Sequence, residues 1–426
     1  MHRPVAISVL VQHFDDLALL RATRSILLRS PQIELVRLAR LDERLSAHVD
    51  GLLVAGDLGY RMALESLESP SVGSVFAVAA LAAARGDQAR LLKLLALFDA
   101  VPEAPRSLAS ALGWVSTDAL RGWTVKLLAA ADPWQRWLGL AACAAHRADP
   151  GDALPAALAH RDAGLRVRAA RMAGQLGRSD LVPALLQGLG NNDPAFRRAC
   201  AGAAVLLGDR SSALDALRAH ALKTREAGPR SDLVEALQLS LLALPPDCAR
   251  VLVRELVATG APLRLTIRAT AWAGEVQAIP WLIRQMADPV HARVAGEAFS
   301  TITGVNLALL DLERKHVPEA DGGPTYDPSD DDVALDEDES LPWPDVDRVQ
   351  AWWGQHQASM PSGTRCFMGA VPDAAHCLLV LREGGQRQRY VAALLLSLMQ
   401  PGTPLFNIAA PAWRQQRALG LPVRVM

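Results

Sequence analysis

The sequence is poor in aromatic residues and carries almost no net charge. Of its 426 residues, 5% are aromatic but 50% are hydrophobic, so the apolar content is mainly Ala, Leu and Val. This composition favours an all-α fold. The formal net charge is −1, whereas a domain that binds nucleic acid usually has a basic excess. Any charged binding surface must therefore be local.

Cysteines and long apolar runs are also scarce. The five cysteines are widely spaced and form no Cys-x-x-Cys motif, which favours a reducing compartment, and we expect a cytoplasmic protein. No cleavage site follows the apolar run 5–11, so we expect no signal peptide. The run 391–399 is far shorter than the roughly 20 residues that cross a bilayer, so we expect no membrane span.

Motifs of known catalytic sites are missing. The sequence contains no Gly-x-Ser-x-Gly nucleophile elbow, no phosphate-binding loop and no His-Glu-x-x-His metal helix. Its 10 histidines are scattered, and no two lie three or four residues apart as ligands on one helix would. We therefore expect a protein without metal or cofactor that is not an enzyme.

A motif recurs about every thirty residues in the middle of the chain. Asp132, Asp162 and Asp193 each precede an apolar stretch that contains arginine, at spacings of 30 and 31 residues. Asp accepts backbone N–H bonds at a helix start, and Pro is tolerated at the first helical position. Gly177 and Gly208 follow where a left-handed helix end needs glycine. This period indicates stacked helical hairpins.

One copy of this motif is the most regular. In residues 162–186, Asp162 is followed by Val167-Arg168, Ala169-Ala170, Leu176-Gly177 and Val182-Pro183. This stretch resembles the HEAT-like repeat of the lyase type. The residues 132–158 and 193–217 are similar, and 69–97 and 260–286 are more divergent copies. The resemblance implies an all-α fold, an α-solenoid of HEAT-like hairpins.

The rest of the chain departs from the repeat. Residues 311–347 contain 14 Asp or Glu against Arg314 and Lys315, with Gly and Pro among them, and are typical of a long loop. We predict a helical N-terminal cap at 1–68, HEAT-like repeats at 69–310, an acidic Pro/Gly-containing loop at 311–347 and a helical C-terminal cap at 348–426.

Four strings outside the repeats resemble a bacterial family that occurs in gene neighbourhoods of type VI secretion. They occupy residues 39–52, 299–304, 341–345 and 400–406. None of them is a catalytic signature. The resemblance implies an accessory cytoplasmic role, with a secretion effector or apparatus component as the protein partner.

The candidate binding residues are arginines of the repeats together with acidic and aromatic residues near the loop. They are Arg166, Arg168, Arg197, Arg198, Asp331, Asp332, Asp336, Asp338, Trp343, Trp352 and Trp353. The arginines could line a concave face and pair with a partner's carboxylates, or each could pack on the Asp of the adjacent repeat. The acidic residues could form a solvated linker, fold back on the arginines, or bind a basic partner.

Two functions of different class follow. The first is a non-catalytic protein-binding scaffold, such as an adaptor, chaperone or immunity-like accessory protein of type VI secretion. The alternative is a nucleic-acid-binding HEAT-repeat protein or DNA-glycosylase-like enzyme, which would use the arginines with Trp123, Trp134, Trp137, Trp272 and Trp281. These tryptophans could equally be packing residues. The residues 161–300 contain 18 Arg or Lys against 13 Asp or Glu, a mild excess that makes nucleic acid the less expected partner. The sequence leaves the oligomeric state open.

Overall fold

The computed structural model describes residues 6–97, 101–102, 104–223, 231–315 and 338–423. In these residues it contains 22 α-helices and no strand, which confirms the all-α solenoid prediction. Its contacts divide the chain into two compact units. Unit 1 comprises Met1–Arg29, Ile33–Leu207 and Pro401–Met426, and unit 2 comprises Ser30–Gln32 and Gly208–Gln400. Residues 348–426, expected as one cap, are thus distributed over both units.

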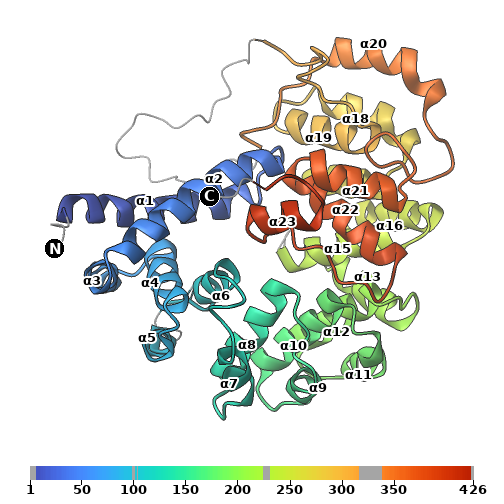
Figure 1. The fold of residues 1–426 in the computed structure, drawn as a ribbon. Coiled ribbons are helices and arrows are strands. Elements are labelled where there is room, and N and C mark those ends of the chain that lie inside the picture. Colours follow the sequence, from blue (N-terminus) through green and yellow to red (C-terminus); the bar gives the residue numbers. More distant parts are fainter. Residues whose placement is uncertain (1–5, 98–100, 103, 224–230, 316–337, 424–426) are drawn as a thin grey trace. The chain divides into compact units, whose positions relative to one another are not determined.

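Unit 1 is a row of stacked helical hairpins (Figure 1). The first helices of the hairpins each pack on the next; they are α4 (Val72–Ala84), α6 (Ala104–Trp114), α8 (Pro133–His146), α10 (Ala163–Leu176) and α12 (Pro194–Leu206). The shorter second helices pack beside them; they are α5 (Gln88–Lys93), α7 (Trp123–Ala129), α9 (Ala153–Leu158) and α11 (Val182–Gly188). At one end, α1 (Ile7–Leu27) packs on α4, and α2 (Leu35–Val54), α3 (Asp57–Glu65) and α23 (Ala412–Ala418) complete the unit.

Unit 2 repeats this arrangement. Its stacked helices are α13 (Ser212–Ala221), α15 (Ser231–Ala243), α17 (Leu263–Ala273) and α19 (Ala292–Thr303). The helices packed beside them are α16 (Pro246–Ala258), α18 (Ile279–Gln285) and α20 (Val346–His356). The helices α21 (Ala374–Glu383) and α22 (Gln386–Met399) form a further hairpin within the region expected as a helical C-terminal cap, and α22 packs on α15. Among the helices described, none has the length and apolarity needed to cross a membrane.

The predicted helix starts are present at all three repeats. Asp132 accepts from the N–H of Trp134 at 3.1 Å, Asp162 from that of Leu165 at 2.7 Å, and Asp193 from that of Ala195 at 2.9 Å. Between successive repeats, small residues allow a close approach. A Cβ added to Gly174 of α10 would lie 2.8 Å from the Cα of Ala203 in α12. The Asp residues therefore cap the starts of the repeat helices, as their spacing predicts. The small residues allow successive repeats to pack closely.

The carboxyl ends of the stacked helices are covered by two extended segments of the chain, which we call segment 401–411 and segment 364–370. In unit 1, the N–H of Leu405 donates to the carbonyl of Gln175 at 2.9 Å, and Asn407 donates to that of Ala145 at 3.0 Å. In unit 2, the N–H of Cys366 donates to the carbonyl of Gly274 at 2.8 Å. Both segments thus bind carbonyls at helix ends, which lack partners inside the helix.

The arginine and backbone donors of segment 364–370 extend this binding over three helices. Arg365 donates to the carbonyls of Leu242 and Leu244 at the end of α15, at 2.7 and 2.8 Å. The N–H groups of Met368 and Gly369 reach the end of α19, where they donate to Thr301 and Ile302 at 2.7 and 2.9 Å. One short segment therefore joins the ends of α15, α17 and α19.

Glycines at the helix ends have a second function beside their backbone angle. Gly177 and Gly274 adopt φ values of 74° and 69°, the left-handed region expected of a helix end. A Cβ on Gly177 would lie 2.2 Å from the carbonyl oxygen of Gly402, and one on Gly274 would lie 2.5 Å from that of Cys366. Glycine therefore also makes room for the covering segments. In α8, Arg147 occupies this position with a φ of 55° and donates to Leu405 at 2.7 Å.

We predict that Gly274→Ala lowers the free energy of unfolding at least twice as much as Gly260→Ala. Gly260 has a φ of 75° and open space around its Cβ, so its replacement carries only the left-handed strain of about 1 kcal/mol. Gly274→Ala also displaces segment 364–370 and its hydrogen bonds, each worth about 1 kcal/mol. Urea unfolding measures both losses, and equal losses would contradict the proposed steric function of Gly274.

Candidate protein-binding site

Two of the predicted arginines connect neighbouring repeats. Arg166 lies over the ring of Phe196 in α12, with its guanidinium carbon 5.2 Å from the ring centre, and its Nη2 lies 3.9 Å from Asp193 Oδ2. Arg168 lies over Trp137 in α8 at 5.8 Å. Burial lowers the pKa of Arg168 to about 10, with Arg171 adding to the effect. Arg166 thus lies near the Asp of the adjacent repeat, which was one of the two alternatives, whereas Arg168 packs on an aromatic ring of the preceding repeat helix.

The other two arginines differ from this pair. Arg197 is exposed, and its Nη1 donates to the carbonyl of Asn191 at 3.1 Å. Arg198 is half-buried. Arg197 is thus the member of the set whose guanidinium is the most open to a partner, although it already binds the turn before its own helix.

Among its described residues, the acidic segment contacts a repeat helix of unit 2 through Asp338. Asp338 is 3% exposed and accepts from both terminal nitrogens of Arg264 in α17, with the Nη2 bond at 2.8 Å. Such a two-point contact is among the stronger pairs that proteins form. At Asp338 the segment therefore folds back on an arginine of a repeat helix. Asp331, Asp332 and Asp336 lie outside the described residues.

Further charged and aromatic groups surround this pair in unit 2. Glu297 of α19 accepts from Arg387 of α22 at 2.7 Å. Burial raises the pKa of Glu297, while Arg387 and then Arg268 act in the opposite direction. The guanidinium of Arg293 lies 4.8 Å above the ring of Trp343. Trp343 is therefore held by packing beside the anchored end of the acidic segment.

The two tryptophans of α20 face the core of unit 2. Trp352 packs against Phe299 at 5.7 Å and stacks on His356 at 4.2 Å. Trp353 is 4% exposed and belongs to a hydrophobic cluster with Ile279 and Phe299. Its indole nitrogen has no hydrogen-bond partner among the described residues. Of the five tryptophans considered for a nucleic-acid site, Trp123 and Trp272 are buried, and Trp137 and Trp281 pack against hydrophobic clusters. Trp134 is 41% exposed and packs edge-on against Trp137.

A cavity of about 390 Å³ lies beside Trp353. Its wall combines Trp353, Pro246, Pro280 and Met360 with the paired side chains of Arg250 and Glu275. Arg250 Nε lies 2.6 Å from Glu275 Oε1, so the charge at this wall is neutralised. Ser362, Gly363 and Thr364 border the cavity just before segment 364–370 covers the helix ends. The cavity therefore suits a mainly apolar group.

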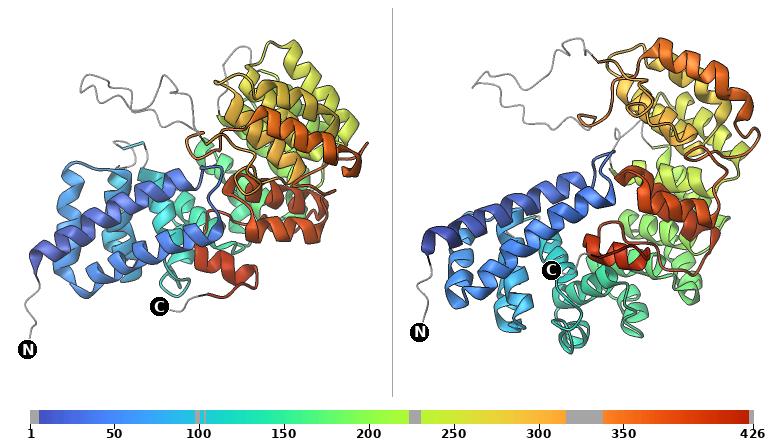
Figure 2. Two further views of the ribbon diagram at one scale, coloured as in Figure 1. Left: turned by 90° about the horizontal axis from the view of Figure 1, so that it is seen from above. Right: turned by 45° about the horizontal axis from the view of Figure 1, so that its top comes forward.

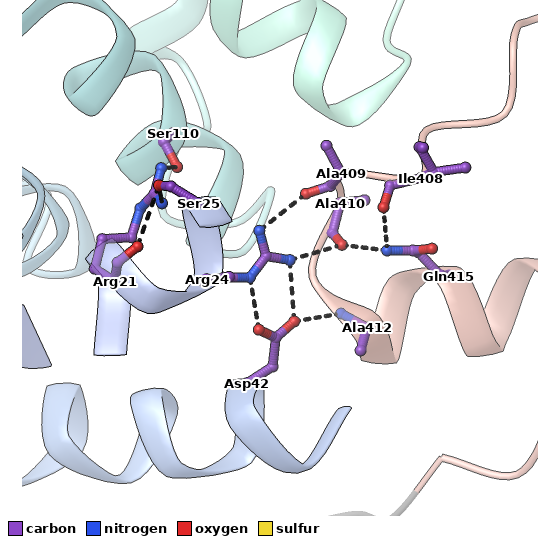
Figure 3. Close-up of polar contacts among 10 residues, drawn as sticks. All are labelled: Arg21, Arg24, Ser25, Asp42, Ser110, Ile408, Ala409, Ala410, Ala412 and Gln415. Carbon is purple, nitrogen blue, oxygen red and sulfur yellow. Dashed lines mark hydrogen bonds and ion pairs between the residues drawn. The ribbon is translucent and has the colours of Figure 1, made fainter. Parts of the chain in front are cut away.

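A buried ion pair in unit 1 was not predicted from the sequence (Figure 3). Arg24 of α1 is 3% exposed and Asp42 of α2 is fully buried, with Arg24 Nε 2.6 Å from Asp42 Oδ1. Arg24 also donates to the carbonyls of Ala409 and Ala410, and Asp42 accepts from the N–H of Ala412 at 2.8 Å. Together they hold the start of α23. The signal in the sequence was the presence of arginine inside an apolar helix.

None of the four cysteines whose pKa is shifted is an activated nucleophile. Burial raises the pKa of Cys143 and Cys366 to about 11 and that of Cys200 and Cys377 to about 12. A thiol is nucleophilic as the thiolate, so a raised pKa lowers its reactivity at neutral pH. No group of three or more His, Cys, Asp or Glu suited to a metal ion occurs in the described part of the chain.

We predict that one thiol of the native protein reacts rapidly with a thiol reagent at neutral pH. Cys248 is the exposed cysteine, and the other four are buried. Counting labelled cysteines by mass spectrometry should give one label in buffer and five in denaturant. Rapid labelling of Cys200 or Cys377 in buffer would contradict the packing of α12 or α21.

We predict that Arg264→Met lowers the free energy of unfolding by about 2 kcal/mol, because it leaves the buried Asp338 carboxylate without its guanidinium. The double variant Arg264→Met/Asp338→Leu should lose less, since it removes both charges. Arg121→Met, which breaks an exposed pair with Asp118, is the matched control and should change stability by under about 0.5 kcal/mol. A double variant less stable than Arg264→Met would contradict the coupling.

The repeat region is similar to a known family. Residues 151–238 match the family model described as HEAT repeats. The match includes the stretch 162–186, on which the resemblance was drawn, and extends from α9 to α15. No curated protein matches the chain. The chain therefore contains a HEAT-like repeat region at residues 151–238.

Proposed function

We propose that this protein is a non-catalytic scaffold that binds a partner protein, and that the cavity beside Trp353 receives an apolar group of that partner. The match to HEAT repeats carries the first part, because stacked hairpins of this kind commonly present extended surfaces to other proteins. The cavity supports the second part. It combines apolar walls with a small number of polar groups, as ligand sites usually do.

The state of the predicted arginines argues in the same direction. Arg166 and Arg168 are engaged with rings of adjacent repeats, so they are poorly placed to follow a phosphate backbone. We further propose, on the resemblance of residues 39–52, 299–304, 341–345 and 400–406 alone, an adaptor, chaperone or immunity-like function in type VI secretion. A secretion effector or an apparatus component would then be the partner.

Affinity capture with cross-linking from the native cell tests the proposal. The expected result is one protein partner whose cross-links map around Gln277 and Thr364, two exposed residues at the cavity. Binding of duplex DNA with a steep salt dependence, without a protein partner, would show that the scaffold proposal is wrong.

We predict that Gln277→Trp weakens capture of this partner about tenfold, because the indole covers the cavity mouth. Gln350→Trp is the matched control: Gln350 is an exposed glutamine of unit 2 that does not line the cavity. Both substitutions are on the surface, so circular dichroism should give unchanged folding. Equal capture of the two variants would show that the cavity is not part of the interface, and it would not contradict the scaffold function.

A further inference from the structure

The first helix of unit 1 has its polar and apolar residues in an unusual arrangement. Arg21 and Arg24 face inward and are 8% and 3% exposed. Leu19 and Ile26 point outward and are 64% and 39% exposed. In Figure 2, α1 runs along α2 and lies at an edge of the unit. A helix at the end of a repeat stack normally exposes a polar face to water. The exposed aliphatic residues of α1 therefore need another explanation.

The outward residues of α1 follow the spacing of a helix-pairing surface. Asp15, Leu19, Ala22 and Ile26 are exposed, and Arg29 is exposed in the turn that follows the helix. Their separations of four, three, four and three residues are those of the contact positions in paired helices. We call these five residues the α1 stripe. The stripe has one aliphatic residue on each side of a central alanine. A negative charge, Asp15, lies at one end and a positive charge, Arg29, at the other.

The α1 stripe is complementary to itself in the antiparallel direction. Reversing its order places Asp15 opposite Arg29, Leu19 within one residue of Ile26, and Ala22 opposite Ala22. A two-fold axis through Ala22 would therefore pair opposite charges at both ends and aliphatic side chains between them. The small side chain at the axis lets the two helices approach closely. A parallel arrangement would instead place like charges side by side.

We propose that the α1 stripe is the interface of a homodimer, in which α1 pairs antiparallel with α1 of a second copy of this chain. The contact is about four turns long, which is short for a protein interface, so the dimer forms and separates with concentration. This interface does not involve the cavity of unit 2, and the proposal does not depend on the proposed scaffold function. It would give the protein two copies of any partner site.

Charge exchange is the first test. Analytical ultracentrifugation over a wide range of concentration should give a monomer–dimer equilibrium for the wild type. Asp15→Arg and Arg29→Asp should each weaken it about tenfold, because the symmetry places the repulsion at both ends. The double variant Asp15→Arg/Arg29→Asp should restore dimerisation. Leu19→Glu should abolish it, whereas Val9→Glu is the control: Val9 is 49% exposed on α1 but lies outside the stripe.

Disulfide trapping tests the direction of pairing. With the exposed Cys248 changed to Ser, Ala22→Cys should give a disulfide-linked dimer on mild oxidation, because residue 22 faces its own copy. Leu19→Cys should not, since two such residues would be separated by about 9 Å along the axis. A monomer at every concentration would overturn the proposal. So would efficient trapping through Leu19→Cys, or failure of the charge-exchanged double variant to dimerise.

Discussion

The free carbonyl groups at the ends of the stacked helices are the constraint on which this structure depends. Each helix leaves its last carbonyls without partners inside the helix. Stacking of parallel helices brings several such ends together, so one extended segment can serve several of them. Segment 401–411 does this for α8 and α10, and segment 364–370 for α15, α17 and α19. The residues after the repeats are thus part of the body that the repeats form.

This arrangement explains why Arg24 and Asp42 are buried beside segment 401–411. Arg24 lies inside α1 because the carbonyls of Ala409 and Ala410 and the carboxylate of Asp42 supply its acceptors. With arginine on the inner face, part of the aliphatic content of α1 is turned outward. The same interaction anchors the start of α23, while Leu19 and Ile26 lie on the exposed side of α1.

The candidate binding residues illustrate what a pattern can and cannot predict. Arg166 and Arg168 lie on different faces of α10, and their positions in the repeat were compatible with either a binding face or inter-repeat packing. The rings of Phe196 and Trp137 lie beneath them, and these rings belong to other repeats. Asp338 was expected in a solvated linker, folded back on the repeat arginines, or bound to a basic partner; its actual partner, Arg264, was not among the candidate arginines and lies 74 residues away in the sequence. No local pattern predicts such a partner.

The sequence by itself determined the all-α class, the thirty-residue repeat, the helix starts at Asp132, Asp162 and Asp193, and the glycine helix end at Gly177, because capping and backbone angle are local properties. Only the tertiary structure decided that Gly177 and Gly274 also make room for another segment, and that Trp353 lies beside a cavity. It likewise decided which face of α1 is buried. These features depend on residues distant in the chain, whose proximity arises from packing.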